Sequence, residues 1–246
     1  MAVAFADSSI VVLALPNLYG AFDTSIVGVS WVITSYNVVV AVAALGAVAL
    51  ARRLSPRAVV RSGLVLFTAG SVGCACAWSL AALIAFRCVQ GLGGALFLVA
   101  SLALLSALTG SREHGVGRWT AVALLGAATG PFLGGVLTQV FDWRAIFVAQ
   151  APVAAVALLA TRGSLSLERE TPPGRLRRRG ALAADAALGL VFAALVGALF
   201  LAVLLVITVW GLDPIEGALV VSALPLASVV TRPLGRGVAT PAAVAG

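Results

Sequence analysis

The sequence contains no lysine and very few charged side chains. Only 10% of its 246 residues are charged and 61% are hydrophobic, whereas soluble domains have about 25% charged and about 45–50% apolar residues. A soluble fold of this length could not bury so much apolar surface, so the composition predicts that lipid surrounds most of the chain. All sixteen basic residues are Arg, nearly all in short breaks between apolar runs. This distribution argues against nucleic-acid binding despite the net charge of +7.

Residues that commonly carry catalysis or bind metals are also scarce. The three cysteines, Cys74, Cys76 and Cys88, lie inside apolar runs, where we interpret them as small buried hydrophobes. The single histidine, His114, lies in a polar break and is interpreted as solvated. The sequence shows no nucleophile–base arrangement, phosphate loop or Cys/His cluster. We therefore predict that the chain is not an enzyme and holds no metal or cofactor.

Long apolar runs, in contrast, are abundant. Crossing about 30 Å of hydrocarbon requires about 20 helical residues at a rise of about 1.5 Å each. Eight runs are candidates for such spans: residues 2–20, 31–51, 59–78, 81–107, 118–140, 144–161, 183–210 and 215–231. The seventh run is too long for one span and too short for two, which predicts a tilt or a kink. The expected fold is all-α and transmembrane.

One charged segment divides the chain. Residues 162–182 contain Arg, Glu, Pro and Gly without helical periodicity, which predicts a basic cytoplasmic linker. Residues 1–161 before it form a predicted six-helix transmembrane bundle. Residues 183–246 after it begin a second bundle, which is incomplete with two helices.

The distribution of charge predicts the orientation in the membrane. Fourteen of the sixteen Arg lie in breaks on one side of the predicted spans. The breaks on the other side contain Asp23, Asp142, Asp213 and Glu216, with Arg144 as their only base. The positive-inside rule makes the Arg-rich side cytoplasmic, and both termini lie on that side. Four of the five Trp are predicted to form an interfacial belt on the opposite side: Trp31, Trp78, Trp143 and Trp210. We predict a multi-pass protein of the plasma (inner) membrane.

Two ionisable side chains, Asp7 and Arg87, fall well inside the apolar runs. A charge at that depth costs at least ~2.5–3.5 kcal/mol on insertion scales, so such residues normally face a bundle interior or an aqueous cavity. They could form a structural ion pair that locks two helices together, or a proton or substrate site. We favour the functional interpretation, and the sequence leaves both open.

Small residues accompany these charges at helical spacing. Gln90 and Gly91 follow Arg87 by three and four residues and share its helical face. In the fifth span, Gly126, Gly130 and Gly134 recur every four residues, a pattern that predicts close contact with another helix. Pro131 removes one helical hydrogen bond and is expected to bend this span.

Together these residues resemble the major facilitator superfamily, and within it the fourteen-helix drug:proton antiporter branch. Asp7-Ser8-Ser9-Ile10-Val11 through Pro16 resembles the first-helix motif D-x-T-I-V-N-x-A-L-P, and Trp31 through Asn37 resembles the opening W-x-x-T-x-Y-x-L of helix two. Arg87, Gln90 and Gly91 resemble the helix-four motif R-x-x-Q-G. Gly126, Gly130, Pro131, Gly134 and Gly135 resemble the helix-five antiporter motif G-x-x-x-G-P-x-x-G-G. Trp143, Arg144 and Phe147 resemble the start of helix six, with Gln150 where Asn is usual.

The resemblance implies a transporter driven by the proton gradient. It implies that Asp7 and Arg87 take part in proton coupling and that the fifth-span glycines serve antiport rather than symport. Substrate would bind near the midplane between two six-helix halves and be exposed to each side in turn. Tyr36, Asn37 and Phe97 are candidate cavity residues by their helix position. The expected partners are the bilayer, protons and a small, mostly apolar drug or metabolite, without nucleic acid or an obligate protein partner.

The chain departs from the family pattern in two ways. The family loop G-x-L-x-D-R-x-G-R-R corresponds here to residues 48–57, a candidate cytoplasmic gating loop that contains Arg52, Arg53 and Arg57. Arg52 replaces the usual acid and Ser55 the usual glycine. In addition, whole members need twelve or fourteen helices. The alternative hypothesis is therefore a truncated, non-transporting form, and a symporter of the same fold is a further rival that the fifth-span glycines argue against.

Overall fold

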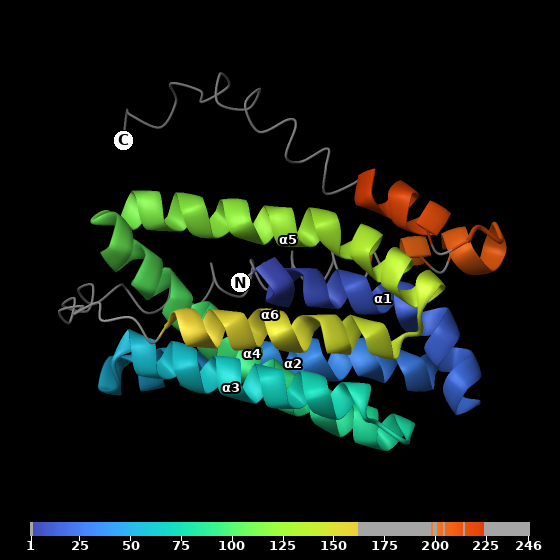
Figure 1. Ribbon diagram of the computed structural model, residues 1–246, viewed down its shortest axis with the longest axis horizontal. Helices are drawn as coiled ribbons and strands as arrows, with labels where there is room; N and C mark the ends of the chain where they lie inside the picture. The colour runs from blue at the N-terminus through green and yellow to red at the C-terminus, as the bar shows by residue number, and fades with distance from the viewer. Residues whose placement is uncertain (1, 162–197, 199–200, 204, 214, 224–246) are drawn as a thin grey trace, which may run out of the picture.

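The computed structural model describes residues 2–161, 198, 201–203, 205–213 and 215–223. Residues 2–161 form a bundle of six helices (Figure 1). These are α1 (Ala2–Phe22), α2 (Ile26–Arg53), α3 (Pro56–Ala75), α4 (Leu80–Thr109), α5 (Arg112–Val140) and α6 (Arg144–Ala160). The expected all-helical transmembrane fold is confirmed, because no strand occurs in the described part of the chain and each of the first six predicted spans is a helix.

By length and composition, α2, α3, α4 and α5 are each able to cross a membrane. Shorter apolar helical stretches occur in α1 (Ile10–Phe22) and α6. Only parts of the last two predicted spans are described: a π-helical turn, Leu205–Val209, and a helical segment, 215–223. The predicted linker at 162–182 lies outside the described residues.

Serine caps place the starts of four helices. The side-chain oxygens of Ser25, Ser55, Ser79 and Ser111 each accept a hydrogen bond from the backbone N–H three residues later. Such a bond satisfies one of the free N–H groups at a helix start. At the other end of α4, Gly110 adopts the left-handed conformation, with φ of 65°, which a glycine tolerates without steric cost. The helices are therefore joined by short, tight turns, and α2 begins five residues earlier than its apolar run predicted.

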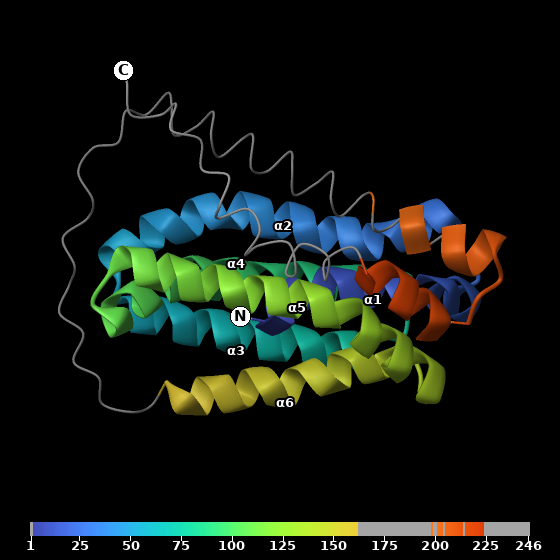
Figure 2. The ribbon, with the colours of Figure 1, turned by 90° about the horizontal axis from the view of Figure 1, so that it is seen from above.

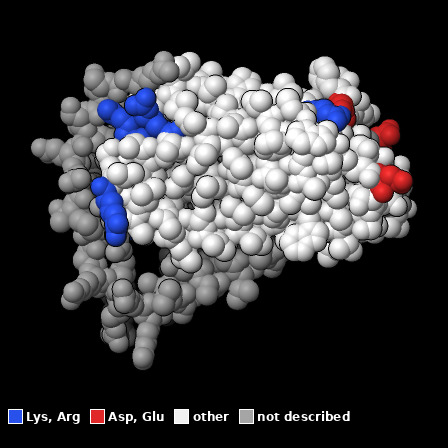
Figure 3. All heavy atoms as spheres, turned by 90° about the horizontal axis from the view of Figure 1, so that it is seen from below, with Lys and Arg blue, Asp and Glu red and all other residues white. Residues whose placement is uncertain are grey.

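Charged side chains gather at the two ends of the bundle. Figure 3 shows Arg side chains at one end and acidic side chains at the other, where one Arg accompanies them. The described part of the chain thus has the charge asymmetry that the sequence indicated. Between the ends the outer surface is apolar: Val27, Val42 and Leu45 of α2 are each about two-thirds exposed. Such a band is expected where lipid takes the place of water.

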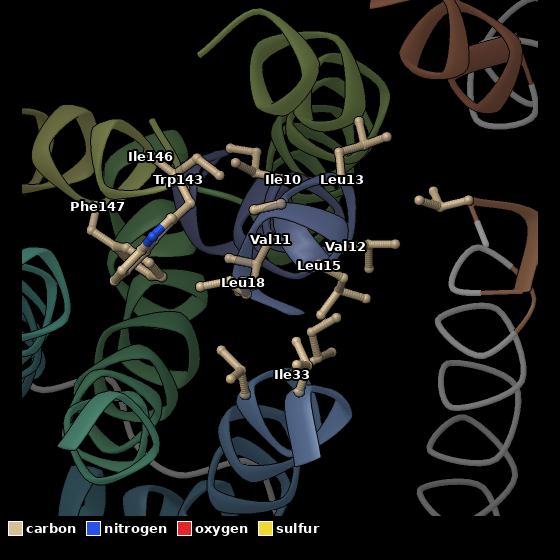
Figure 4. Packing of buried hydrophobic residues seen from close by; sticks show 14 of the residues in the cluster. Ile10, Val11, Val12, Leu13, Leu15, Leu18, Ile33, Trp143, Ile146 and Phe147 are labelled. Carbon is tan, nitrogen blue, oxygen red and sulfur yellow. The ribbon is translucent and has the colours of Figure 1, made fainter. Parts of the chain in front are cut away.

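The core surrounds α1. Its residues Val11, Val12, Leu13 and Leu18 have at most 1% of their surface exposed. Figure 4 shows side chains leaving α1 in several directions, with Trp143, Ile146 and Phe147 of α6 on one side and Ile33 of α2 on another. The two views place α1 beneath α5 and between α2 and α6 (Figures 1 and 2). This position explains why α1 is buried on faces that a peripheral membrane helix would expose to lipid.

The prediction of an interfacial belt was wrong for Trp143. Its side chain is 1% exposed and packs against Phe22 and Phe147, with ring centroids 5.5 and 6.2 Å away. Trp31, Trp78 and Trp210 are exposed, as a belt requires. The position of a Trp along a helix gives its depth in the membrane but not the face on which it lies, and the face of Trp143 is turned into the core.

Glycines bring the backbones of neighbouring helices close together. A Cβ atom added at Gly134 of α5 would lie 2.6 Å from the carbonyl oxygen of Ile10 in α1, and one at Gly126 would collide with Ala2. In the same way, Gly70 of α3 leaves room for the backbone of Gln90 in α4. These contacts hold α1 against α5, and α3 against α4, at a depth where α1 and α4 carry their charges.

Candidate intramembrane polar site

Asp7 and Arg87 form an ion pair in the middle of the bundle. Arg87 Nη1 lies 2.6 Å from Asp7 Oδ2, and both side chains have 0% of their surface exposed. Asp7 comes from α1 and Arg87 from α4, 80 residues later in the chain. The two intramembrane charges that the sequence singled out are therefore partners. Each largely offsets the cost of burying the other.

The guanidinium of Arg87 is held in place by α2. Its Nε donates to the carbonyl oxygen of Val32 at 3.0 Å. Its carbon atom Cζ lies 4.2 Å from the centroid of the Tyr36 ring, a distance at which a cation is attracted to the aromatic face. The Tyr36 hydroxyl donates to the carbonyl oxygen of Ala4 in α1 at 3.4 Å. Arg87 thus lies where α1, α2 and α4 meet.

Two amide side chains extend the pair into a closed ring. Arg87 Nη1 donates to Gln90 Oε1 at 2.7 Å, and Gln90 Nε2 donates to Gln150 Oε1 at 2.7 Å. Gln150 Nε2 then donates to Asp7 Oδ1 at 2.8 Å, which closes the ring. Gln90 Nε2 also donates to Ser71 Oγ of α3 at 2.9 Å. With Gln150 supplied by α6, the ring joins α1, α4 and α6, and its bonds to Ser71 of α3 and to the Val32 carbonyl of α2 extend the network to five helices.

The ring is isolated from solvent. Gln90 and Ser71 are fully buried, and Gln150 is 3% exposed. In a medium of low dielectric, hydrogen bonds of this kind are strong, and an unpaired member is costly. Arg87 Nη2 has no hydrogen-bond partner among the side chains and backbone groups that the structure describes. The site therefore has one spare donor beside a fully paired carboxylate.

The remaining predicted site residues lie in varied places. Asn37 is half-buried, and its Nδ2 donates to the carbonyl oxygen of Ile33 in its own helix. Phe97 packs edge-on against Phe67, with ring centroids 5.5 Å apart, between α3 and α4. A role for Tyr36, Asn37 and Phe97 in a substrate cavity stays a prediction.

The predicted gating loop lies at the Arg-rich end of the bundle. Arg53 ends α2 and is exposed, and Arg57 is half-buried at the start of α3. The side chain of Arg52 is outside what the structure describes. Gly91 of the helix-four motif faces the carbonyl oxygen of Tyr36 in α2, and Gly130, Pro131 and Gly135 are buried in α5. The gating role of the three arginines stays a prediction.

Sequence reasoning missed Gln150, a member of the ring, and Ser71, which accepts a hydrogen bond from it. It noted Gln150 only as a residue that stands where Asn is usual, although an amide inside the apolar run of α6 was a visible signal. Such a group needs a partner once it is buried. Ser71 gave no comparable signal, because a serine within a helix commonly bonds its own backbone. Ser71 does so here as well, donating to the carbonyl oxygen of Phe67 at 2.8 Å.

Comparison with known proteins gives the family. The model of the Major Facilitator Superfamily matches residues 1–241. The chain belongs to the major facilitator superfamily. This confirms the resemblance found in the sequence, and it agrees with the prediction that the chain is not an enzyme, because the family consists of membrane transporters. The chain is accordingly a multi-pass membrane protein.

Individual relatives are similar over most of the chain. It is 38% identical over 203 residues to the multidrug resistance protein Stp of Mycobacterium tuberculosis, which is 81% of this chain and 36% of Stp. It is 36% identical over 163 residues to the methylenomycin A resistance protein of Bacillus subtilis, which is 65% of this chain and 35% of that protein. The chain therefore spans only about a third of the length of these curated relatives.

A solved structure has the same fold. A bacterial homologue of the human lysosomal transporter Spinster, in an inward-facing and occupied conformation, superposes with a TM-score of 0.75. The match covers 98% of this chain and 60% of that structure at 18% sequence identity. At this identity the likeness shows the fold alone.

Proposed function

We propose that this chain is the N-terminal portion of a proton-coupled antiporter that exports small, mostly apolar compounds such as drugs or metabolites. The observation that carries the proposal is the buried pair of Asp7 and Arg87 at the meeting point of three helices. Ionisable groups inside the membrane are expensive and most often mark an ion or substrate pathway. The names of the relatives, which describe drug resistance and efflux, support the direction of transport.

In this proposal Asp7 takes up a proton from one side of the membrane and releases it to the other. Arg87 supplies the positive charge that stabilises the carboxylate between these two events. The glycine face of α5 keeps α1 close to α5, so that a change at Asp7 is transmitted to a neighbouring helix. Rocking of two helical bundles about a midplane site would then alternate access to the substrate.

We also propose an orientation. The Arg-rich end of the bundle in Figure 3 faces the cytoplasmic side of the plasma (inner) membrane. The predicted cytoplasmic position of the two chain termini falls on residues outside the described part of the chain, in which Ala2 lies beside Gly126, midway along α5. The acidic end, with Asp23 and Asp142, faces outward. In this orientation protons that enter from outside reach the bundle at its acidic end.

A second candidate function applies to the 246 residues taken alone. The curated relatives are about twice as long, and an alternating-access site lies between two bundles. The 246-residue chain would then be a non-transporting portion of such a protein. Expressing this chain and a full-length relative in the same efflux-deficient cells distinguishes the two: accumulation of dye with the chain alone and export with the relative favour the second candidate.

Asp7→Asn tests the proposed coupling. The substitution removes the charge and the titratable proton but preserves the shape of the side chain. We expect loss of proton-driven efflux of a cationic dye from vesicles with an imposed pH gradient, while the amount of inserted protein is unchanged. Asp23→Asn is the matched control, because Asp23 is exposed at the acidic end and its φ of 43° suits Asn equally well. Undiminished efflux by Asp7→Asn would refute the coupling role.

A further inference from the structure

We propose that Gln150 is the positioning residue through which protonation of Asp7 releases α6 from α1. The proposal rests on the proposed proton coupling and assigns a step within it. Gln150 is the one contribution of α6 to the hydrogen-bonded ring among the described residues, and it contacts both Asp7 and Gln90. The argument depends on the direction of each hydrogen bond in that ring.

The ring has a fixed direction because its two charged members have opposite capacities. A guanidinium is only a donor and a carboxylate is only an acceptor. From Arg87 to Asp7 run two routes: a direct hydrogen bond at 2.6 Å, and a relay through Gln90 and then Gln150. Each amide in the relay accepts on the Arg87 side and donates on the Asp7 side. Turning either amide over would place a donor against a donor.

A proton on Asp7 disturbs these hydrogen bonds. Taken up from water, the proton forms an O–H bond on one carboxylate oxygen and neutralises the charge. On Oδ2 the new donor would face the guanidinium of Arg87, which cannot accept. On Oδ1 the new donor would face Gln150 Nε2, while Oδ2 still accepts from Arg87. The proton is therefore better placed on Oδ1, and the link to Gln150 is the one that weakens.

Reorienting the amides does not rescue that link. If Gln150 turned its oxygen toward the new O–H group, its Nε2 would face Gln90 Nε2. If Gln90 turned as well, its Nε2 would face Arg87 Nη1, which is only a donor. Each reorientation thus leaves two donors facing each other, and the last of them is Arg87, which cannot accept a hydrogen bond. Protonation therefore weakens the α1–α6 hydrogen bond, because it removes the negative charge of the acceptor and places a competing O–H group beside Gln150 Nε2.

The packing of α6 allows a release at this point. α6 lies chiefly against α3 and has few contacts with α1. Its contact with α1 near the acidic end is an aromatic one, between Trp143 and Phe22. Beyond Gln150, Pro152 interrupts the helical hydrogen bonding of α6, which makes a bend there less costly. The segment from Gln150 to Ala160 can therefore tilt away from α1 while it stays packed against α3 through Ala154, with the aromatic contact as a pivot.

No other group competes for the proton within the ring. The titratable or charged groups around Asp7 are Arg87 on α4, Tyr36 on α2 and Cys74 on α3. Tyr36 donates to a backbone carbonyl of α1, and the thiol of Cys74 lies within 4.0 Å of the Leu83 carbonyl oxygen and Gln90 Oε1. The described parts of α5 and α6 form no ion pair with Asp7. A single proton at Asp7 therefore controls the link.

The position of α6 can be measured directly in the full chain. Nitroxide labels are attached through Ala160→Cys at the end of α6 and Gly117→Cys near the start of α5, after the three native cysteines are replaced. Both positions are exposed, and nothing lies within 4 Å of a Cβ at Gly117. Pulsed electron paramagnetic resonance then gives the distance between the labels as a function of pH. We expect one pH-dependent change in this distance, between a docked form at high pH and a released form at low pH.

Variants separate this mechanism from simple packing. Gln150→Leu cannot bond Asp7, so we expect the released distance at every pH. Asp7→Asn mimics the protonated carboxyl and should also give the released distance at every pH. Combining Asp7→Asn with Gln150→Glu moves the single carboxylate from α1 to α6. The amide at position 7 then donates to the carboxylate at position 150, which still accepts from Gln90, so the docked form and its pH response should return.

The outcomes distinguish this inference from the proposed function. A label distance that does not change with pH in the unmodified ring overturns the inference, as does failure of the double substitution to restore docking when the single ones abolish it. Dye efflux is measured on the same variants in vesicles. Proton-driven efflux together with a pH-independent label distance would support the proposed function and contradict this inference. A pH-dependent label distance without any efflux would support the inference and contradict transport by the chain.

Discussion

Replacing Gly134 by Ala should separate α1 from α5 and disturb the polar site at a distance. The added Cβ would lie 2.6 Å from the carbonyl oxygen and 2.9 Å from the Cα of Ile10, where ordinary contacts begin at 3.4 Å. Both atoms belong to the backbone, so α1 must retreat by about 0.8 Å, the difference between 2.6 and 3.4 Å. Overpacking of this kind costs about 1–3 kcal/mol. Ile10 is also less than one turn from Asp7, whose ion pair with Arg87 would be stretched.

The control is the same substitution in open space. A Cβ at Gly46 of α2 would meet nothing within 4 Å, and Ala favours a helix over Gly by about 1 kcal/mol. In thermal unfolding of the detergent-solubilised protein, Gly134→Ala should lower the Tm and Gly46→Ala should leave it unchanged or raise it. Each kcal/mol corresponds to about 2–4 °C for a chain of this size. Equal Tm values for the two variants would refute the argument that the glycine face of α5 sets the distance to α1.

Two further substitutions test the contacts of the site and of the core. Arg87→Lys keeps the charge but has a single nitrogen, which cannot reach Asp7, Gln90 and the Val32 carbonyl together. We expect about 1–3 kcal/mol of lost stability and, in the dye assay, loss of proton-driven efflux. Wild-type values in both measurements would contradict the role given to the separate nitrogens of the guanidinium. Trp143→Ala should cost about 3–5 kcal/mol because the side chain is buried, whereas Trp78→Ala, at a side chain 77% exposed, should change stability by less than about 0.5 kcal/mol. Comparing the two Tm values checks this difference, and similar losses would show that burial in the bundle is not what stabilises Trp143.

Much of the fold was predictable because the bilayer limits the choices. A span must be apolar and helical, and the polar breaks between spans are short, so six helices followed from the apolar runs alone. The starts of α2 and α5 were the largest errors, because Ser25 and Ser111 cap helices whose first residues lie outside the apolar runs that were counted. Trp143 was misplaced for a related reason: hydropathy gives depth in the membrane but does not show which face of a helix is turned inward.

The candidate site was predictable only in part. Asp7 and Arg87 stood out because opposite charges in hydrocarbon need partners, and few partners were available. The place of Gln150 was not predictable, since 143 residues separate it from Asp7 and only tertiary packing brings them together. The amide inside the apolar run of α6 signalled a buried polar group but did not indicate which partner it would have. The ring and its bonds to Ser71 and the Val32 carbonyl therefore required the arrangement of five helices in space.

The separation of the ion pair along the chain has a consequence for synthesis. Asp7 leaves the ribosome 80 residues before Arg87, an interval of about 4–16 s at the usual elongation rate of about 5–20 residues per second. During this time a carboxylate near the middle of the first span would face lipid without its cation, at a cost of about 2.5–3.5 kcal/mol. The first helix is therefore expected to remain at the insertion machinery until the fourth arrives. Membrane integration of this bundle is then a joint event of α1 to α4 rather than the addition of one independent helix after another.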